Sequence, residues 1–270
     1  MPRIVNLRPR TSSALALGAL PFLILLAAYI LGSAARMHDN PDDKLLPAGH
    51  SLAQTIHSYA FEEDERSGEV LWWLDTGASL KRLTIALAIS SLIGLSLGLV
   101  IGAIPYVRAT LGPFVGALSM IPPLAVLPIL FITLGLGELA KITLIVIGIT
   151  PCIARDIALR TQELPTEQLI KAQTLGASSW LLASRVILPQ LWPRLIDALR
   201  LTLGSAWLFL IAAEAIASTE GLGYRIFLVR RYMAMDVILP YVAWITLIAF
   251  AMDWGLRVLR AKLFPWAEAR

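Results

Sequence analysis

The sequence predicts an all-α membrane protein with about six transmembrane helices. Of its 270 residues, 57% are hydrophobic and only 16% are charged, a balance well outside that of ordinary soluble domains. Uncharged runs long enough to cross a bilayer recur along the chain, and basic residues stand mostly at their ends, where they report topology. The net charge of +4 is small for nucleic-acid binding, so we expect a lipid bilayer and protein partners but no nucleic acid.

The first predicted element is a cytoplasmic tail and a membrane span, residues 1–35. Arg3, Arg8 and Arg10 precede an uncharged run from 14 to 35, which places the N-terminus in the cytoplasm. A cleaved signal peptide is the alternative, because small residues end the run. We predict a retained span, since the run is longer than a usual signal core.

Residues 36–79 are predicted to form an acidic external loop that contains a short amphipathic helix around 52–59. All three histidines of the chain, His38, His50 and His57, lie in it. Their spacing does not match a metal site, so we expect solvated histidines and no bound metal.

The second span is predicted from Leu83 to Ile104. Gly94, Gly98 and Gly102 recur at every fourth position on one of its faces, and such glycines let another helix approach closely. We expect that helix to belong to the same chain, and a second copy is the alternative.

The third span, Leu111 to Leu134, is uncharged but interrupted by prolines. Broken backbone inside a membrane is tolerated only where protein or a water-filled cavity satisfies the freed polar groups. Met120, Pro122 and Pro123 are therefore candidates for the translocation path, and an ordinary packed kink is the alternative.

The remaining spans are predicted at residues 139–160, 196–217 and 237–256, with a cytoplasmic tail at 261–270. Lys141 is expected to reach the outer interface. Near the inner ends, Asp156 and Asp253 are expected to pair with arginines such as Arg155 and Arg257.

Two features of the outer side stand apart from this topology. Glu214 lies near the outer end of the fifth span, with Trp207 on the same helix, and ionisable groups in a membrane are functional candidates. Both join the candidates for the translocation path, and a hydrogen bond from Glu214 to the turn at 221–224 is the alternative. The positive outer patch of Arg225, Arg230 and Arg231 is expected to attract acidic groups of another protein.

Between the fourth and fifth spans, residues 163–193 predict an elbow of two short amphipathic helices. Thr166 is placed to cap the first helix and Gly176 to end it, while Ser178 caps the second and Pro189 ends it. The second helix has a predicted apolar stripe of Trp180, Leu181, Ser184, Ile187 and Leu188. Its polar side chains exclude the elbow from hydrocarbon, so it lies at a surface, as a docking element or as a solvated connector.

No catalytic constellation is present. The chain has neither a nucleophile, base and orienting acid nor a G-x-x-x-x-G-K loop for nucleotide phosphates. Cys152 is the only cysteine, so neither a disulfide nor a cysteine metal site is available. We expect no enzyme and no cofactor in this chain.

The elbow and several motifs around it resemble a known family. The run Thr174-Leu175-Gly176-Ala177-Ser178 looks like the cytoplasmic coupling motif of ABC-importer permeases, with Ile170 and Lys171 where that motif often has Glu and Ala. Motifs from 79–82 through 121–128, 135–138, 205–207, 213–214 and 221–224 are similar to the nitrate, sulfonate, taurine and bicarbonate group. The resemblance assigns ATPase coupling to Lys171, Ala172, Gln173, Leu175, Gly176, Ala177, Ser178, Leu188 and Pro189.

The resemblance implies a type I importer fold with a five-helix permease core at 80–260 that contains the elbow. It also implies a homodimer in the bacterial inner membrane, with both termini in the cytoplasm. Two ATP-binding subunits, which hold ATP and Mg, would dock inside, and a substrate-binding protein would dock outside. The implied solutes are small and mostly anionic.

Three other readings remain open at this point. The acidic Glu214 and the Arg155-Asp156 pair leave room for an uncharged or cationic nitrogen compound, urea-like or amidine-like. An ATP-independent secondary transporter would need inverted repeats and ionisable groups at the midplane. An intramembrane enzyme would need the catalytic constellation that the sequence lacks.

Overall fold

The computed structural model describes residues 11–39, 44–65 and 67–267, and this part of the chain is helical and contains no strand. The predicted tail at 1–10 and the end of the predicted tail at 261–270, residues 268–270, lie outside the described residues. The long helices are α1 (Thr11–Asp39), α3 (Leu71–Ala103), α6 (Glu138–Gln162), α9 (Leu188–Ala217) and α11 (Met235–Leu263). The shorter ones are α2 (Gly49–Phe61), α4 (Pro105–Leu118), α5 (Pro123–Leu134), α7 (Thr166–Thr174), α8 (Ser179–Leu181) and α10 (Leu222–Val229).

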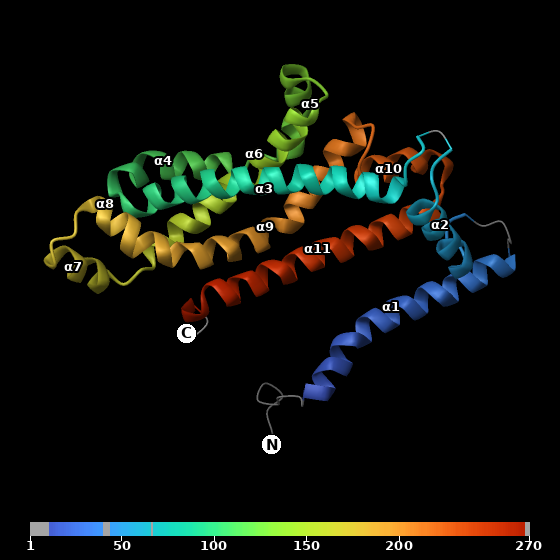
Figure 1. Ribbon diagram of the computed structural model, residues 1–270, viewed down its shortest axis with the longest axis horizontal. Helices are drawn as coiled ribbons and strands as arrows, with labels where there is room; N and C mark the ends of the chain where they lie inside the picture. Colours follow the sequence, from blue (N-terminus) through green and yellow to red (C-terminus); the bar gives the residue numbers. More distant parts are fainter. Residues whose placement is uncertain (1–10, 40–43, 66, 268–270) are drawn as a thin grey trace.

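The number of spans agrees with the sequence prediction. Within the described residues, 5 stretches of helix are long and apolar enough to cross a membrane, and the bent pair α4 and α5 brings the number to 6. Helices α3, α6, α9 and α11 run along the long axis of the molecule (Figure 1). The elbow helices α7 and α8 lie at one end, and α2 and α10 lie at the other.

Helix α6 forms the centre of the core. Its branched side chains recur about one turn apart, so they line one face of the helix. The buried members are Leu144, Ile145, Ile149, Ile153 and Ile157. Helices α3, α5 and α9 pack around this helix, whereas α1 lies beside the bundle (Figure 1). Helix α1 contacts the segment that leads to α2: Tyr29 Oη of α1 donates a hydrogen bond to the carbonyl of Pro47 at 2.7 Å.

The glycine stripe of α3 packs against α6 of the same chain, as favoured from the sequence. A Cβ at Gly94 would lie 2.6 Å from Ile153, and a Cβ at Gly98 would lie 2.6 Å from Ile157. No real side chain tolerates such distances, so glycine is required where these two backbones meet.

We expect Gly98→Ala to lower the free energy of unfolding by about 1–3 kcal/mol, because the added methyl group overpacks the contact with α6. Thermal unfolding in detergent measures the effect. Gly116→Ala on α4 is the matched control, since nothing lies within 4 Å of its added Cβ. Equal unfolding midpoints for the two variants would contradict the close packing of α3 on α6.

The proline-rich third span is broken, as the sequence predicted. Helices α4 and α5 meet at an angle of 89°, and α5 stands out from the bundle (Figure 1). Pro122 precedes α5 and Pro123 occupies its first turn, where the missing N–H costs nothing. A helix cannot pass through this pair because proline disfavours helical backbone in the residue before it. Helix α4 begins at Pro105, earlier than the predicted start at Leu111.

The predicted external loop at 36–79 ends early, because α3 already begins at Leu71. The short helix predicted within the loop is present as α2. Trp72 explains the extension of α3: its ring packs against Tyr241 at 4.7 Å and against Trp244 at 5.6 Å, between ring centroids. These contacts bury one face of the first turns of α3. Helices α9 and α11 likewise extend beyond their predicted spans.

Candidate functional site

The elbow turns sharply at Gly176. Helix α7 ends at Thr174, and Gly176 adopts a positive φ of 85°. The amide of Gly176 donates to the carbonyl of Gln173 at 2.9 Å, and the amide of Ala177 donates to that of Ala172 at 3.0 Å. This pair of bonds is a Schellman motif, which satisfies the last carbonyls of the helix and fixes the direction of the chain. The prediction that Gly176 ends the first helix of the elbow is confirmed.

Ser178 caps the next helix, as predicted, because its Oγ accepts the amide hydrogen of Leu181 at 3.3 Å. Two other predictions for the elbow are wrong. Thr166 lies in the first turn of α7, after the cap residue Pro165, and makes no capping bond. Pro189 does not end the second helix, since a π-helical stretch, Leu182–Ile187, joins α8 to α9. Pro189 lies in the first turn of α9, where it is tolerated.

The base of the elbow is anchored and its tip is free. Gln190 Nε2 on α9 donates to Gln168 Oε1 on α7 at 3.3 Å, and Ile187 is buried. At the tip, Leu175 is 81% exposed and Trp180 is 80% exposed. The predicted apolar stripe is therefore divided: Ile187 and Leu188 pack on the core, whereas Trp180 and Leu181 are exposed. The tip therefore presents an exposed surface with two large apolar side chains beside charged Lys171.

Most of the predicted coupling residues are exposed on the elbow. Lys171, Gln173, Leu175, Gly176, Ser178 and Pro189 are exposed, whereas Ala172, Ala177 and Leu188 are half-buried. Trp180 and Ile170 belong to the same exposed surface, and sequence analysis did not assign them to it. Trp180 had been placed in the apolar stripe of the second helix.

A buried polar cluster fastens the opposite end of the bundle. Glu214 on α9 is 0% exposed and pairs with Arg82 on α3, with 2.8 Å between Oε1 and Nη1. Ser79 Oγ donates to the same carboxylate at 2.8 Å, and the amide of Gly223 donates to it at 2.9 Å. The alternative role predicted for Glu214, a hydrogen bond to the 221–224 turn, is present in the structure.

Arg82 also links Glu214 to the start of α6. Its Nη2 donates to Glu138 Oε1 at 2.8 Å, and Lys141 Nζ contacts the same oxygen at 2.8 Å. Lys141 further donates to Ser218 Oγ at 3.1 Å. Lys141 is thus buried within the cluster and does not extend to an outer interface as predicted. Glu138 neutralises its charge, and Ser218 accepts a hydrogen bond from it.

Asp75 holds the start of α10 to α3. Its carboxylate accepts hydrogen bonds from the amide of Gly221 at 2.8 Å, from Arg225 Nε at 2.8 Å and from Tyr241 Oη at 3.2 Å. Burial opposes the charge of Arg225, but the hydrogen bond and the charge of Asp75 outweigh it and raise the pKa of Arg225. The prediction that Arg225 belongs to a positive outer patch is therefore wrong, because Asp75 already neutralises its charge.

The two glycines of the 221–224 turn are required by these contacts. Gly221 has a φ of 124°, and a Cβ there would lie 2.6 Å from the Glu214 carboxylate. A Cβ at Gly223 would lie 2.7 Å from the carbonyl of Ile211. The cluster is therefore a tightly fitted joint that connects α3, α6, α9, α10 and α11, and its hydrogen bonds are satisfied.

Sequence analysis did not assign Asp75, Ser79 and Arg82 to this joint. The signal was available, since spacings of four and three residues place all three on one face of a helix. Asp253 does pair with Arg257 at 3.0 Å, as predicted. Asp156 pairs with Arg160 at 3.5 Å and not with Arg155, because adjacent residues of a helix point in different directions.

The predicted path residues fall into two groups. Met120, Pro122 and Pro123 lie at the exposed break between α4 and α5. Trp207 and Glu214 are buried in α9. The assignment of all five to a translocation path stays a prediction.

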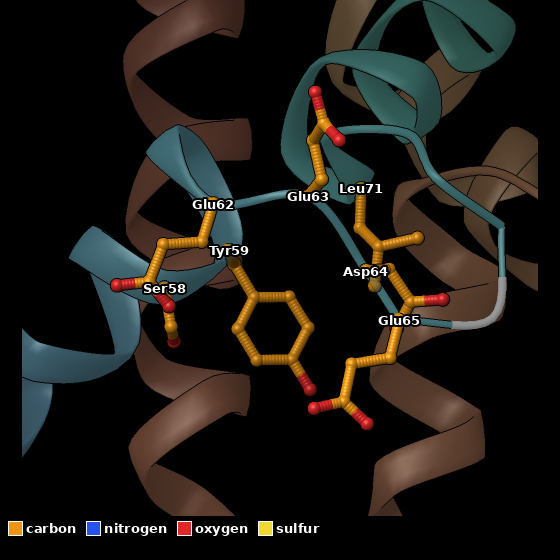
Figure 2. A pocket seen from close by; sticks show the side chains of 7 residues that line it. All are labelled: Ser58, Tyr59, Glu62, Glu63, Asp64, Glu65 and Leu71. Carbon is orange, nitrogen blue, oxygen red and sulfur yellow. The ribbon is translucent and has the colours of Figure 1, made fainter.

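A separate hollow of about 230 Å³ lies between the end of α2 and the start of α3 (Figure 2). Its lining residues are Ser58, Tyr59, Glu62, Glu63, Asp64, Glu65 and Leu71. Among the residues that the structure describes, no group of three or more potential ligands is arranged to hold a metal ion. His57 contacts Glu62 at 3.1 Å and is exposed, as expected for a solvated histidine.

Comparison with known proteins gives one family. Residues 85–265 match the model of the family described as binding-protein-dependent transport system inner membrane component. The taurine transport system permease protein TauC of Escherichia coli is 38% identical over 194 residues, which are 72% of this chain and 70% of TauC. The bicarbonate transport system permease protein CmpB of Synechocystis sp. is 26% identical, over 92% of this chain and 87% of CmpB.

Another relative is the putative aliphatic sulfonates transport permease protein SsuC of Bacillus subtilis, 28% identical over 77% of this chain and 75% of SsuC. Among solved structures, an inward-facing MetNI methionine ABC transporter superposes with a TM-score of 0.62 at 20% identity. The superposition covers 70% of this chain and 94% of that chain, and it establishes the type I importer fold.

These matches do not favour an ATP-independent secondary transporter or an intramembrane enzyme. ATP hydrolysis belongs to a separate subunit. The chain is a multi-pass permease subunit of an ABC importer, and it belongs to the family of binding-protein-dependent transport system inner membrane components.

Proposed function

We propose that this permease imports a small solute that carries an anionic group, of the taurine, sulfonate or bicarbonate type. The names of three relatives, the permeases for taurine, bicarbonate and aliphatic sulfonates, support this class. Two copies of the chain form the path in the inner membrane, and an external binding protein delivers the solute to the end that holds α2 and α10.

The elbow is the ATPase dock in this proposal. Its exposed tip, with Leu175 and Trp180 beside Lys171, is the single observation that carries the coupling role. Two ATP-binding subunits, which hold ATP and Mg, bind the elbows on the cytoplasmic face, where both chain termini also lie. The Schellman turn at Gly176 makes the tip rigid, so closure of the ATPase pair moves α6 and α9 together.

The buried polar cluster weakens the alternative that the solute is cationic, which was based on the acidic Glu214. Glu214 suggested an acidic path, but its charge is paired with Arg82 and it is inaccessible in this structure. A buried, paired carboxylate exerts little field on a passing solute. An anionic cargo is therefore compatible with the acidic residue in the fifth span.

Reconstitution tests the solute class. The permease, its ATPase and its binding protein are placed in liposomes, and ATP-dependent uptake of labelled taurine, bicarbonate and urea is measured. We expect uptake of one of the two anion-bearing solutes and none of urea. Uptake of urea alone would contradict the proposal. Liposomes without the ATPase are the control, and they should take up nothing.

A further inference from the structure

A second cavity lies between α3, α4 and α6, near the ends that face the elbow side. Its volume is about 160 Å³, the space of about five water molecules. The walls are largely apolar, and the charged side chains are two arginines, with no carboxylate. The lining residues are Ile101, Arg108, Gly112, Val115, Ala154, Arg155, Ala158, Leu159 and Gln162.

Arg155 extends from this cavity to the break in the third span. Its Nη1 donates to Ser119 Oγ at 2.7 Å, and Ser119 is the residue that ends α4. Within the described part of the chain, Arg155 forms no ion pair with a carboxylate. Its neighbour Asp156 is paired with Arg160 at 3.5 Å. Arg155 is thus an exposed cation on a membrane-spanning helix whose charge is not neutralised by the protein.

The direction of Arg155 excludes ordinary snorkelling. Val115 of α4 belongs to one packed cluster with Ala154 and Ala158 of α6, so it lies level with this part of α6. Ser119 lies one turn beyond Val115, on the side away from the Gln162 end of α6. Arg155 therefore points toward the middle of the helix, whereas an arginine that sought the nearer interface would point toward Gln162.

Arg108 supplies the second cation of the cavity. Its guanidinium donates to the carbonyls of Ile101, at 3.3 Å, and Gly102. A guanidinium has five N–H donors in a planar fork, so each arginine retains donors for a further partner. Forked donors suit the oxygens of a sulfonate or carboxylate, and apolar walls strengthen the attraction.

We propose that Arg155 and Arg108 form an anion-binding site inside the permease, where the sulfonate or carboxylate-like group of the solute binds during passage. The inference rests on the proposed anionic cargo, and it adds a site in this chain to the selectivity of the external binding protein. The site joins the cavity to the break at Ser119, so the bent third span forms one wall of the path.

Cys152 provides a reporter for this site. It is exposed and lies one turn before Arg155 on α6, and the chain has no other cysteine. The full-length permease in phosphatidylcholine nanodiscs is treated with methanethiosulfonate reagents that carry either an ethylsulfonate or a trimethylammonium group. The thiolate displaces methanesulfinate and forms a mixed disulfide, and the mass of the chain gives the rate.

We expect the sulfonate reagent to react about tenfold faster than the cationic one, because positive side chains concentrate anions locally. Arg155→Gln should abolish this preference and Arg155→Lys should retain most of it. Arg160→Gln is the matched control: it lies on the same helix but is paired with Asp156 and Glu163, so the preference should persist. Taurine at millimolar concentration should slow the sulfonate reagent.

Three results would overturn the site. They are an unchanged preference in Arg155→Gln, absence of labelling by either reagent, and protection by added phosphatidylglycerol but not by taurine or bicarbonate, which would indicate a lipid headgroup. The solute class is judged separately by uptake in liposomes. Taurine or bicarbonate uptake with an unchanged preference in Arg155→Gln rejects the site alone. If the labelling of Cys152 prefers the sulfonate reagent only when Arg155 is present, but the liposomes take up urea, the proposed solute class alone is rejected.

Discussion

Replacing Arg82 by methionine is expected to lower the free energy of unfolding of the permease by about 3–5 kcal/mol, because it leaves a buried carboxylate without its cation. Arg82 is 2% exposed and Glu214 is 0% exposed, so water cannot replace the lost partner. Ser79 and the amide of Gly223 would still donate to Glu214, but neutral donors do not offset a buried charge. The unfolding midpoint in detergent measures the loss.

Two further variants separate the ion pair from a general effect of substitution. Arg257→Met removes a cation that is 58% exposed and paired with Asp253, and it should leave the midpoint almost unchanged. The double variant Arg82→Met with Glu214→Leu should recover much of the loss, since the uncompensated charge is gone. An Arg82→Met protein as stable as the Arg257→Met control would contradict the structural role of the cluster.

Leu175→Asp at the tip of the elbow is expected to weaken binding of the ATPase by at least about thirtyfold, or about 2 kcal/mol. Leu175 is exposed in the permease alone, so the substitution does not disturb the fold, but it places a charge where an apolar contact forms. Co-purification and ATP-driven uptake measure the result. Leu263→Asp, at the exposed end of α11, is the control, and it should retain both properties.

The elbow was largely predictable because its determinants are local. A glycine at a helix end and a serine before the next helix fix the turn through bonds between near neighbours. The prediction failed at Pro189 because proline disrupts the interior of a helix but is tolerated in its first turn. Pro189 lies in the first turn of α9, directly after the π-helical stretch. It failed at Trp180 because an exposed apolar residue has the same sequence signature as a buried one.

The polar cluster was less predictable because its bonds join residues far apart in the chain. Glu214 could be singled out as an acid in an apolar span, and the 221–224 turn could be named as its partner. The spacing of Arg82 places it on one face of a helix with Asp75 and Ser79, but nothing local shows that α3 presents this face to α9. The extension of α3 to Leu71 was missed for a related reason: the rings that pack against Trp72, those of Tyr241 and Trp244, belong to α11 and are far away in the sequence.

We infer that the elbow transmits the closure of a separate ATPase to the membrane helices. The most direct test is a cross-link between a cysteine introduced as Ala177→Cys, in a Cys152→Ser background, and the ATPase subunit in native membranes. We expect the introduced cysteine to form a cross-link with the ATPase on the cytoplasmic side, and this cross-link to stop ATP-driven uptake. Labelling of this cysteine only from the external side, with uptake unaffected, would contradict it.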